Sequence, residues 1–383
     1  MIIQPSSRLN TVKEYYFSEK LAEIRQMMAE GKPVLNLGIG NPDGMPAPQV
    51  LQKLKETTDL KDVHGYQSYV GIPELKQAIA EWNNWAYGID LDTEQEVLPL
   101  IGSKEGITHI SLAFLDEGDE VLVPELAYPA YAAVAQMIIA KVVTYPLDET
   151  NNYQPDWRFL EELNTDKVKL MWLNYPHMPT GASAQLETFE RLVAFAKARG
   201  VLLCHDNPYS MILPKDKPLS LLAVNGAKEV ALELNSLSKS FNMAGWRMGW
   251  VAGRADYIKT ILKVKSNVDS GMFKPMMLAA AEALKLRQEW FDELNTVYES
   301  RRVKAYELLE KIGCTYSTDQ QGMFIWAHIP EKYESAKALV DDLLYEKNVF
   351  ITPGVIFGDK GANYVRLSLC STETVLDEAI SRI

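Results

Sequence analysis

The sequence predicts an α/β protein with a large domain, built on a mainly parallel central sheet flanked by helices, and a smaller α+β domain. Three observations lead to this prediction. Apolar runs alternate with helical patterns from Glu96 to Arg254, as in a parallel sheet whose strands are joined by helices. After Gly313 the pattern changes, and segments 322–329 and 364–370 alternate like half-buried strands. The length of 383 residues also exceeds one ordinary core.

Seven apolar runs are the candidate strands of the large domain. In chain order they are EVLPLIG at 96–102, DEVLVP at 119–124, KVVTYPL at 141–147, VKLMWLNYP at 168–176, GVLLCHD at 200–206, EVALEL at 229–234 and MGWVAG at 248–253. Residues 183–200 are predicted to form a helix between two of these strands. The apolar residues that recur there at helical spacing are Leu186, Phe189, Leu192, Val193 and Ala196.

The C-terminal part is predicted to form the smaller domain together with the N-terminal segment. Residues 275–313 favour helix, and 336–345 and 373–383 are also predicted to be helical. We expect the large domain to cover residues 46–285 and the small domain to combine 1–45 with 286–383.

Composition indicates a globular protein of the cytoplasm. Hydrophobic residues make up 47% and charged residues 23%, and neither a membrane span nor a secretory signal is evident. The net charge of −12 argues against nucleic acid as a partner, because phosphate backbones attract basic surfaces. Cys204, Cys314 and Cys370 are widely spaced, so we expect neither a disulfide framework nor a metal site.

Lys239 follows the apolar run 229–234 in the segment NSLSKSFNMAGWRMGW. A lysine at the end of a strand is usually a solvated surface residue. The alternative is an amine held in a pocket, where desolvation and nearby positive charge lower its pKa and prepare it to form a Schiff base. That alternative requires a carbonyl partner and an acid, which other segments must supply.

Two further segments offer such partners. In LIGSKEGITHISLAF, a strand ends at Gly102 and a helix begins near Ser103 or Lys104, whose free N–H groups would attract a phosphate. A simple helix cap explains the same residues. In VLLCHDNPYSMI, Asp206 ends a strand and Tyr209 follows, where ligands bind open α/β sheets. Asp206 could cap a turn, or hold a proton on a heterocyclic nitrogen.

Arg366 lies in YVRLSLC, on the strand face opposite Val365 and Leu367. An arginine there could be a solvated edge residue, but its forked guanidinium also suits a substrate carboxylate. Amine, phosphate site, acid and carboxylate anchor together describe pyridoxal phosphate chemistry.

In order, spacing and residue type, this set resembles the class I/II aminotransferases, the aspartate aminotransferase superfamily of pyridoxal-phosphate enzymes with fold type I. The most specific match is SLSKSFNMAGWRMGW at 236–250, and the resemblance covers nearly the whole chain. It implies pyridoxal 5'-phosphate as the cofactor and transfer of an amino group from an L-amino acid to a 2-oxo acid. Lys239 would bind the cofactor as a Schiff base and then move the proton.

The resemblance also implies roles for other residues around the cofactor. Asp206 is similar to the partner of the pyridine nitrogen, and Tyr209 to the donor to the ring oxygen. Tyr128, in PELAYPAY, is similar to the aromatic residue that stacks on the ring. The positions that match phosphate-binding residues are Ser103, Lys104, Ser236 and Arg247.

Two substrate contacts and one contact between subunits follow from the same resemblance. Gly40, in NLGIGNPD, and Arg366 match groups that hold the α-carboxylate of the substrate. Tyr66, in HGYQSYVGIPEL, resembles a tyrosine that reaches the phosphate in the neighbouring subunit. The resemblance therefore implies a homodimer with shared active sites.

One residue departs from the family pattern. The family usually has Asn-Pro-Thr-Gly, with an asparagine that donates to the cofactor's ring oxygen, whereas Met178 precedes Pro179 here. A thioether cannot donate a hydrogen bond. His177 could in principle substitute, but we expect its side chain to point elsewhere.

Two other functions stay open at this point. A lyase that eliminates at Cβ or Cγ, such as a C–S lyase, would use the same lysine and aspartate, and a non-catalytic regulator could retain the fold. The segment SNVDSGMF at 266–273 is similar to relatives that act on diaminopimelate, aspartate or large apolar amino acids, so the sequence does not choose the substrate.

Overall fold

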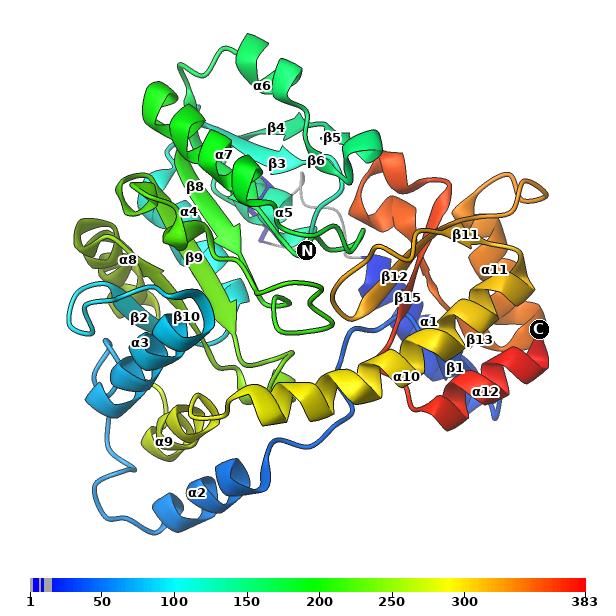
Figure 1. Ribbon diagram of the computed structural model, residues 1–383, viewed down its shortest axis with the longest axis horizontal. Coiled ribbons are helices and arrows are strands. Elements are labelled where there is room, and N and C mark those ends of the chain that lie inside the picture. Colours follow the sequence, from blue (N-terminus) through cyan, green and yellow to red (C-terminus); the bar gives the residue numbers. More distant parts are fainter. Residues whose placement is uncertain (1–2, 7, 10–15) are drawn as a thin grey trace.

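The computed structural model describes residues 3–6, 8–9 and 16–383. Its centre is a seven-stranded sheet (Figure 1). The strands are β2 (Val97–Leu100), β3 (Glu120–Pro124), β4 (Lys141–Tyr145), β7 (Val168–Leu173), β8 (Leu202–Asp206), β9 (Ala231–Ser236) and β10 (Gly249–Gly253). The spatial order is β2-β10-β9-β8-β7-β3-β4, and β10 alone runs antiparallel to its neighbours. The predicted α/β fold class is confirmed.

The central strands are apolar because helices cover both faces of the sheet. Leu203 of β8 packs into the core on one face, whereas Leu202 and Cys204 pack into the core on the other, as the alternation of a strand requires. Burying one leucine side chain stabilises the fold by about 1.5–3 kcal/mol. Strands of this kind hold their carboxyl ends at a fixed edge of the sheet.

Two layers of helices sandwich the sheet. The first layer contributes apolar residues to one core cluster and consists of α4 (Ser103–Phe114), α5 (Ala130–Met137) and α8 (Ala255–Val268). The opposite core cluster receives residues from α2 (Pro48–Thr58), α3 (Pro73–Tyr87), α6 (Trp157–Glu162), α7 (Leu186–Arg199) and α9 (Lys274–Ala283). Helix α7 begins later than predicted, because Gln185 is still extended, and it ends where Gly200 adopts a φ of 67°.

The C-terminal part contains a second, antiparallel sheet. Its order is β11-β12-β15-β14, formed by β11 (Thr315–Tyr316), β12 (Phe324–His328), β15 (Tyr364–Ser368) and β14 (Thr352–Pro353). Helices α10 (Gln288–Ile312), α11 (Ala336–Lys347) and α12 (Glu373–Arg382) pack around it. The stretch predicted to be helical at 275–313 is two helices, and α10 extends from the large sheet to α12 (Figure 1).

The N-terminal segment contacts the C-terminal part through a short parallel pairing. Strand β1 (Leu35–Asn36) pairs with β13 (Val349–Phe350), and α1 (Tyr16–Ala29) precedes β1. A hairpin of β5 (Leu147–Asp148) and β6 (Gln154–Pro155) completes the strands. The domain division at 46–285 stays a prediction. Within the described part of the chain, every helix is too short or too polar to cross a membrane.

Candidate active site

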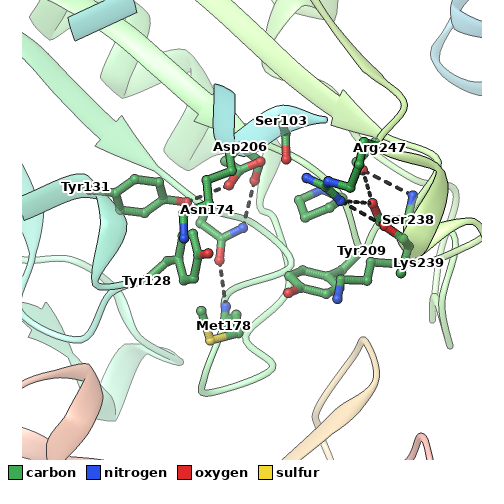
Figure 2. Close-up of a pocket in the computed structure, with 14 residues that line it drawn as sticks. Ser103, Tyr128, Tyr131, Asn174, Met178, Asp206, Tyr209, Ser238, Lys239 and Arg247 are labelled. Atoms are coloured by element: carbon green, nitrogen blue, oxygen red, sulfur yellow. Dashed lines mark hydrogen bonds between the residues drawn. The ribbon is translucent and has the colours of Figure 1, made fainter. Parts of the chain in front are cut away.

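A cavity of about 190 Å³ lies at the carboxyl ends of the parallel strands, the edge where open α/β sheets bind ligands (Figure 2). Nine of the residues singled out in the sequence line it: Ser103, Lys104, Tyr128, Met178, Asp206, Tyr209, Ser236, Lys239 and Arg247. Figure 2 shows Tyr131 and Asp206 on one side of the cavity and Ser238, Lys239 and Arg247 on the other.

Lys239 follows β9 and extends its amine into this cavity. Its Nζ donates a hydrogen bond to the carbonyl oxygen of Gly40 at 2.5 Å. Burial lowers the pKa of the amine, and the positive charges of Arg366 and Arg247 lower it further. A lowered pKa favours the neutral, nucleophilic form of the amine.

Asp206 ends β8 with a carboxylate of which only one oxygen is paired within the described chain. Its Oδ2 accepts a hydrogen bond from the Tyr131 hydroxyl at 2.8 Å, whereas Oδ1 is buried and has no partner there. Burial raises the pKa of Asp206 to about 6. A buried carboxylate oxygen without a donor is costly, so its presence in a cavity fits a ligand that supplies an N–H group.

An anion cradle lies beside Lys239. Helix α4 begins at Ser103, directly after Gly102, whose φ of 79° is in the left-handed region. A Cβ at Gly102 would collide with the Arg247 guanidinium, so the backbone approaches that side chain closely. The N–H groups at the start of α4, the guanidinium and the hydroxyls of Ser236 and Ser238 suit a phosphate.

Aromatic residues form another wall of the cavity. Tyr128 is half-buried and meets Tyr131 edge to face, with ring centroids 5.8 Å apart. Tyr131 stacks on Trp172 of β7 at 4.9 Å, so its hydroxyl is held against Asp206. Burial raises the pKa of the Tyr209 hydroxyl, which therefore remains a donor at neutral pH. A flat heterocycle fits between such groups.

Arg366 lies on β15 and is buried close to the cavity rather than in its lining. Its Nη2 donates to the carbonyl oxygen of Gly38 at 2.8 Å, and its Nη1 donates to Sδ of Met178 at 3.3 Å. The guanidinium carbon lies 3.9 Å from the ring centroid of Phe324 and 4.6 Å from that of Phe357.

Met178 lines the cavity from a loop that polar side chains hold in place. Its N–H donates to Oδ1 of Asn174 at 2.8 Å, while Nδ2 of Asn174 donates to the Asp206 carbonyl oxygen at 2.7 Å. His177 is buried and uses one ring nitrogen with the Thr180 hydroxyl and the other with the Leu126 carbonyl oxygen. Both ring nitrogens of His177 are therefore engaged with Thr180 and Leu126, so the ring does not replace the absent asparagine.

Besides Arg366, two residues to which the sequence assigned a role in the site do not line the cavity. Gly40 contributes its carbonyl oxygen to Lys239 from a loop that packs on Phe324, whose ring leaves no space for a Cβ. Tyr66 is 97% exposed, so within one chain it does not complete the site.

Three polar residues of the cavity lining were not singled out in the sequence, namely Tyr131, Asn174 and Ser238. Tyr131 lies three residues after Tyr128, about one helical turn away, and Asn174 directly follows β7. Each could have been found from the rule that residues beyond the carboxyl ends of neighbouring strands converge.

A cluster of ionisable side chains lies outside the cavity, between α4 and α8. Glu105, His109 and Asp269 present ligand atoms within 4.8 Å of one another. Nζ of Lys265 lies 2.6 Å from Asp269 and 3.5 Å from Glu105. The cluster is thus an ion-pair network that already contains a lysine.

A buried carboxylate, a lysine amine and an anion cradle at the carboxyl edge of this sheet define a pyridoxal-phosphate enzyme of fold type I. The chain belongs to the class I and II aminotransferases, because the model of that family matches residues 32–383. It is therefore a pyridoxal-phosphate-dependent aminotransferase, as its sequence predicted.

Relatives support the same conclusion. The chain is 39% identical to an LL-diaminopimelate aminotransferase of Dehalococcoides mccartyi over 99% of this chain and 97% of the relative. It is 40% identical to the Aquifex aeolicus enzyme of the same name, over 99% and 98%. Among solved structures, BacF without ligand from Bacillus subtilis superposes with a TM-score of 0.95 at 35% identity, over 100% and 98%. These relatives favour amino transfer over elimination.

Proposed function

We propose that this aminotransferase takes its amino group from LL-diaminopimelate, or a closely similar extended amino acid, with Lys239 as the residue that carries the cofactor. The observation that supports the residue roles most is the buried, unpaired Oδ1 of Asp206 in the same cavity as the Lys239 amine. The names of the relatives support the substrate.

The residues of the cavity fit pyridoxal phosphate. When bound, this cofactor acts as an electron sink that stabilises negative charge at the substrate Cα. Asp206 would hold a proton on the ring nitrogen through its open Oδ1. The start of α4, at Ser103 and Lys104, would bind the phosphate together with Ser236 and Arg247. Tyr209 would donate to the ring oxygen.

Lys239 would also move the proton. Its lowered pKa favours the neutral amine, the form that can accept a proton from the substrate Cα. The bond from Nζ to the Gly40 carbonyl oxygen shows that the side chain reaches the loop that closes this side of the cavity. The same Nζ could therefore serve both as nucleophile and as general base.

Arg366 would bind the α-carboxylate of each substrate. Its fork provides two parallel donors, which match a carboxylate and orient the Cα–H bond toward Lys239. Burial of the guanidinium strengthens such a contact, because water competes less. Gly40 lies next to this position through its contact with the Phe324 ring, which also stacks on Arg366.

We further propose a cytoplasmic homodimer whose subunits complete each other's sites. Tyr66 is 97% exposed, and its loop packs against the segment that follows α8, since a Cβ at Gly271 would collide with the Gln67 carbonyl oxygen. A large exposed aromatic side chain on a packed loop is suited to an interface. Tyr66 would then reach the phosphate in the partner's site.

A panel of amino donors tests the substrate. The decrease of the cofactor's absorption band in single half-reactions would be followed with LL-diaminopimelate and with three matched compounds. The meso isomer inverts the distal centre, L-lysine lacks the distal carboxylate, and L-aspartate is shorter. We expect the LL isomer to have the highest kcat/KM, and a higher value for L-aspartate or L-lysine would refute the substrate assignment.

A further inference from the structure

The contact between Met178 and Arg366 joins a residue that breaks the family pattern to the proposed carboxylate anchor. The sulfur lies 3.3 Å from Nη1, and both side chains are 5% exposed. The two residues come from the loop after β7 and from β15, which are far apart in the sequence. Their proximity is thus a property of the fold that the motif alone does not reveal.

Neutral groups orient the Arg366 guanidinium. The Gly38 carbonyl oxygen accepts from Nη2, the Met178 sulfur accepts from Nη1, and the Phe324 ring lies against the flat face. None of these three groups carries a negative charge. Together they fix the plane and direction of the guanidinium fork.

Met178 is itself held firmly. Its backbone N–H donates to Asn174, whose amide also donates to the Asp206 carbonyl oxygen. The neighbouring His177 bonds both Thr180 and the Leu126 carbonyl oxygen. The backbone of Met178 is thereby tied to the backbone that carries Asp206, and burial of the side chain keeps the sulfur against Arg366.

We propose that Met178 is a positioning residue for substrate binding, whose thioether orients Nη1 of Arg366 so that an incoming carboxylate meets a preset fork. This inference rests on the proposed role of Arg366. A thioether is a weak acceptor, so it can orient the donor and still release it to a carboxylate oxygen. Met178 acts through Arg366 and does not take part in the chemistry.

Two variants distinguish the role of the sulfur as an acceptor from the role of the side chain in filling space. Met178→Leu keeps the apolar volume and removes the acceptor, a change that cores tolerate well. Met178→Gln restores an acceptor at about the same reach. Binding of hexanoate to the holoenzyme would be measured by calorimetry. Hexanamide, which has the same chain length but no charge, is the control ligand, and thermal unfolding would show whether each variant is folded.

We expect hexanoate to bind the leucine variant about threefold more weakly than wild type, with hexanamide unchanged, and the glutamine variant to bind hexanoate within about twofold of wild type. In an Arg366→Lys background, Met178→Leu should cause no further loss, because the lysine has no Nη1 to orient. A merely structural role would weaken both ligands and would not be rescued by glutamine.

Different results would overturn the proposed role of Arg366 and the proposed role of Met178. If Arg366→Lys alone binds hexanoate as wild type does, the anchor role of Arg366 is wrong, and the role of Met178 falls with it. If Arg366→Lys weakens hexanoate binding but the leucine variant binds like wild type, or loses affinity equally for hexanamide, only the role of Met178 is overturned.

Discussion

Replacing Asp206 with asparagine should stabilise the cofactor-free protein while removing most of its activity. The carboxylate is buried, Tyr131 donates to one oxygen, and the other oxygen is unpaired within the described chain. Asparagine has nearly the same shape without the charge. The cost of burying that charge should therefore disappear in the variant, together with the charge that the cofactor needs.

The magnitude follows from the pKa of Asp206. Burial raises it from the ordinary value of 3.8 to about 6. Between these pH values the folded protein binds more protons than the unfolded chain, so its stability falls as the pH rises through this window and stays lower above it. The full difference corresponds to about 3 kcal/mol. The variant should escape this loss but carry the cost of an unmet amide, which does not depend on pH, so about 0–2 kcal/mol of added stability remains above this window.

Urea unfolding of the cofactor-free protein measures this effect. The stability of the asparagine variant relative to wild type should be about 3 kcal/mol higher at about pH 8 than at about pH 4, where the wild-type carboxyl is protonated in the folded state. Its half-reaction should be about 10²–10³ slower, taking the loss of one preorganised electrostatic group as the guide. Tyr131→Phe, which keeps the carboxylate, should lose much less rate. A stability difference between variant and wild type that is the same at both pH values, or a near-normal rate, would refute this reasoning.

Three other changes have defined outcomes. The bound cofactor changes from one absorption band to another as the pH rises, and Met178→Asn should lower the midpoint of this change by about one pH unit, because an amide donor stabilises the negative charge of the ring oxygen. An unchanged midpoint would show that the side chain at position 178 does not contact the ring oxygen. Tyr66→Ala and Lys239→Ala should each be inactive. When subunits of the two variants are mixed, about a quarter of the wild-type activity should return, because half of the dimers then contain one subunit of each kind and one complete site. No recovery of activity would contradict shared sites. Arg301→Ala should lower the free energy of unfolding in urea by about 2 kcal/mol, because Arg301 is 8% exposed and donates to both carboxylate oxygens of the partly exposed Asp43. A loss below about 0.5 kcal/mol would show that this ion pair does not stabilise the fold.

The fold could be predicted where local patterns determine it. Six of the seven strands of the large sheet lie within the predicted apolar runs, and β9 extends two residues beyond its run, because apolar runs of four to six residues mark buried strands clearly. Strand order and the reversed direction of β10 are set by packing between distant segments, which periodicity does not encode. The pairing of β1 with β13 involves two residues on each strand, too few for any pattern.

Some residues of the active site could likewise be predicted from local patterns, whereas others depend on contacts between distant segments. Lys239 and Asp206 could be found because each stands beside a strand end, and the family motif gave them roles. Tyr131 and Asn174 act through bonds to Asp206 that only the folded chain brings together. Met178 and Arg366 are 188 positions apart in the sequence. The sequence therefore showed that Met178 departs from the family pattern, but not that its side chain contacts Arg366.

The most direct test of the central claim is to find which residue carries the cofactor. The holoenzyme would be reduced with borohydride, digested and mapped by mass spectrometry, with Lys239→Arg as the matched control. The proposed site predicts that the cofactor-derived label lies on Lys239 alone and is absent from the control. A label on Lys104 or any other lysine, or an undiminished label in the control, would contradict the assignment.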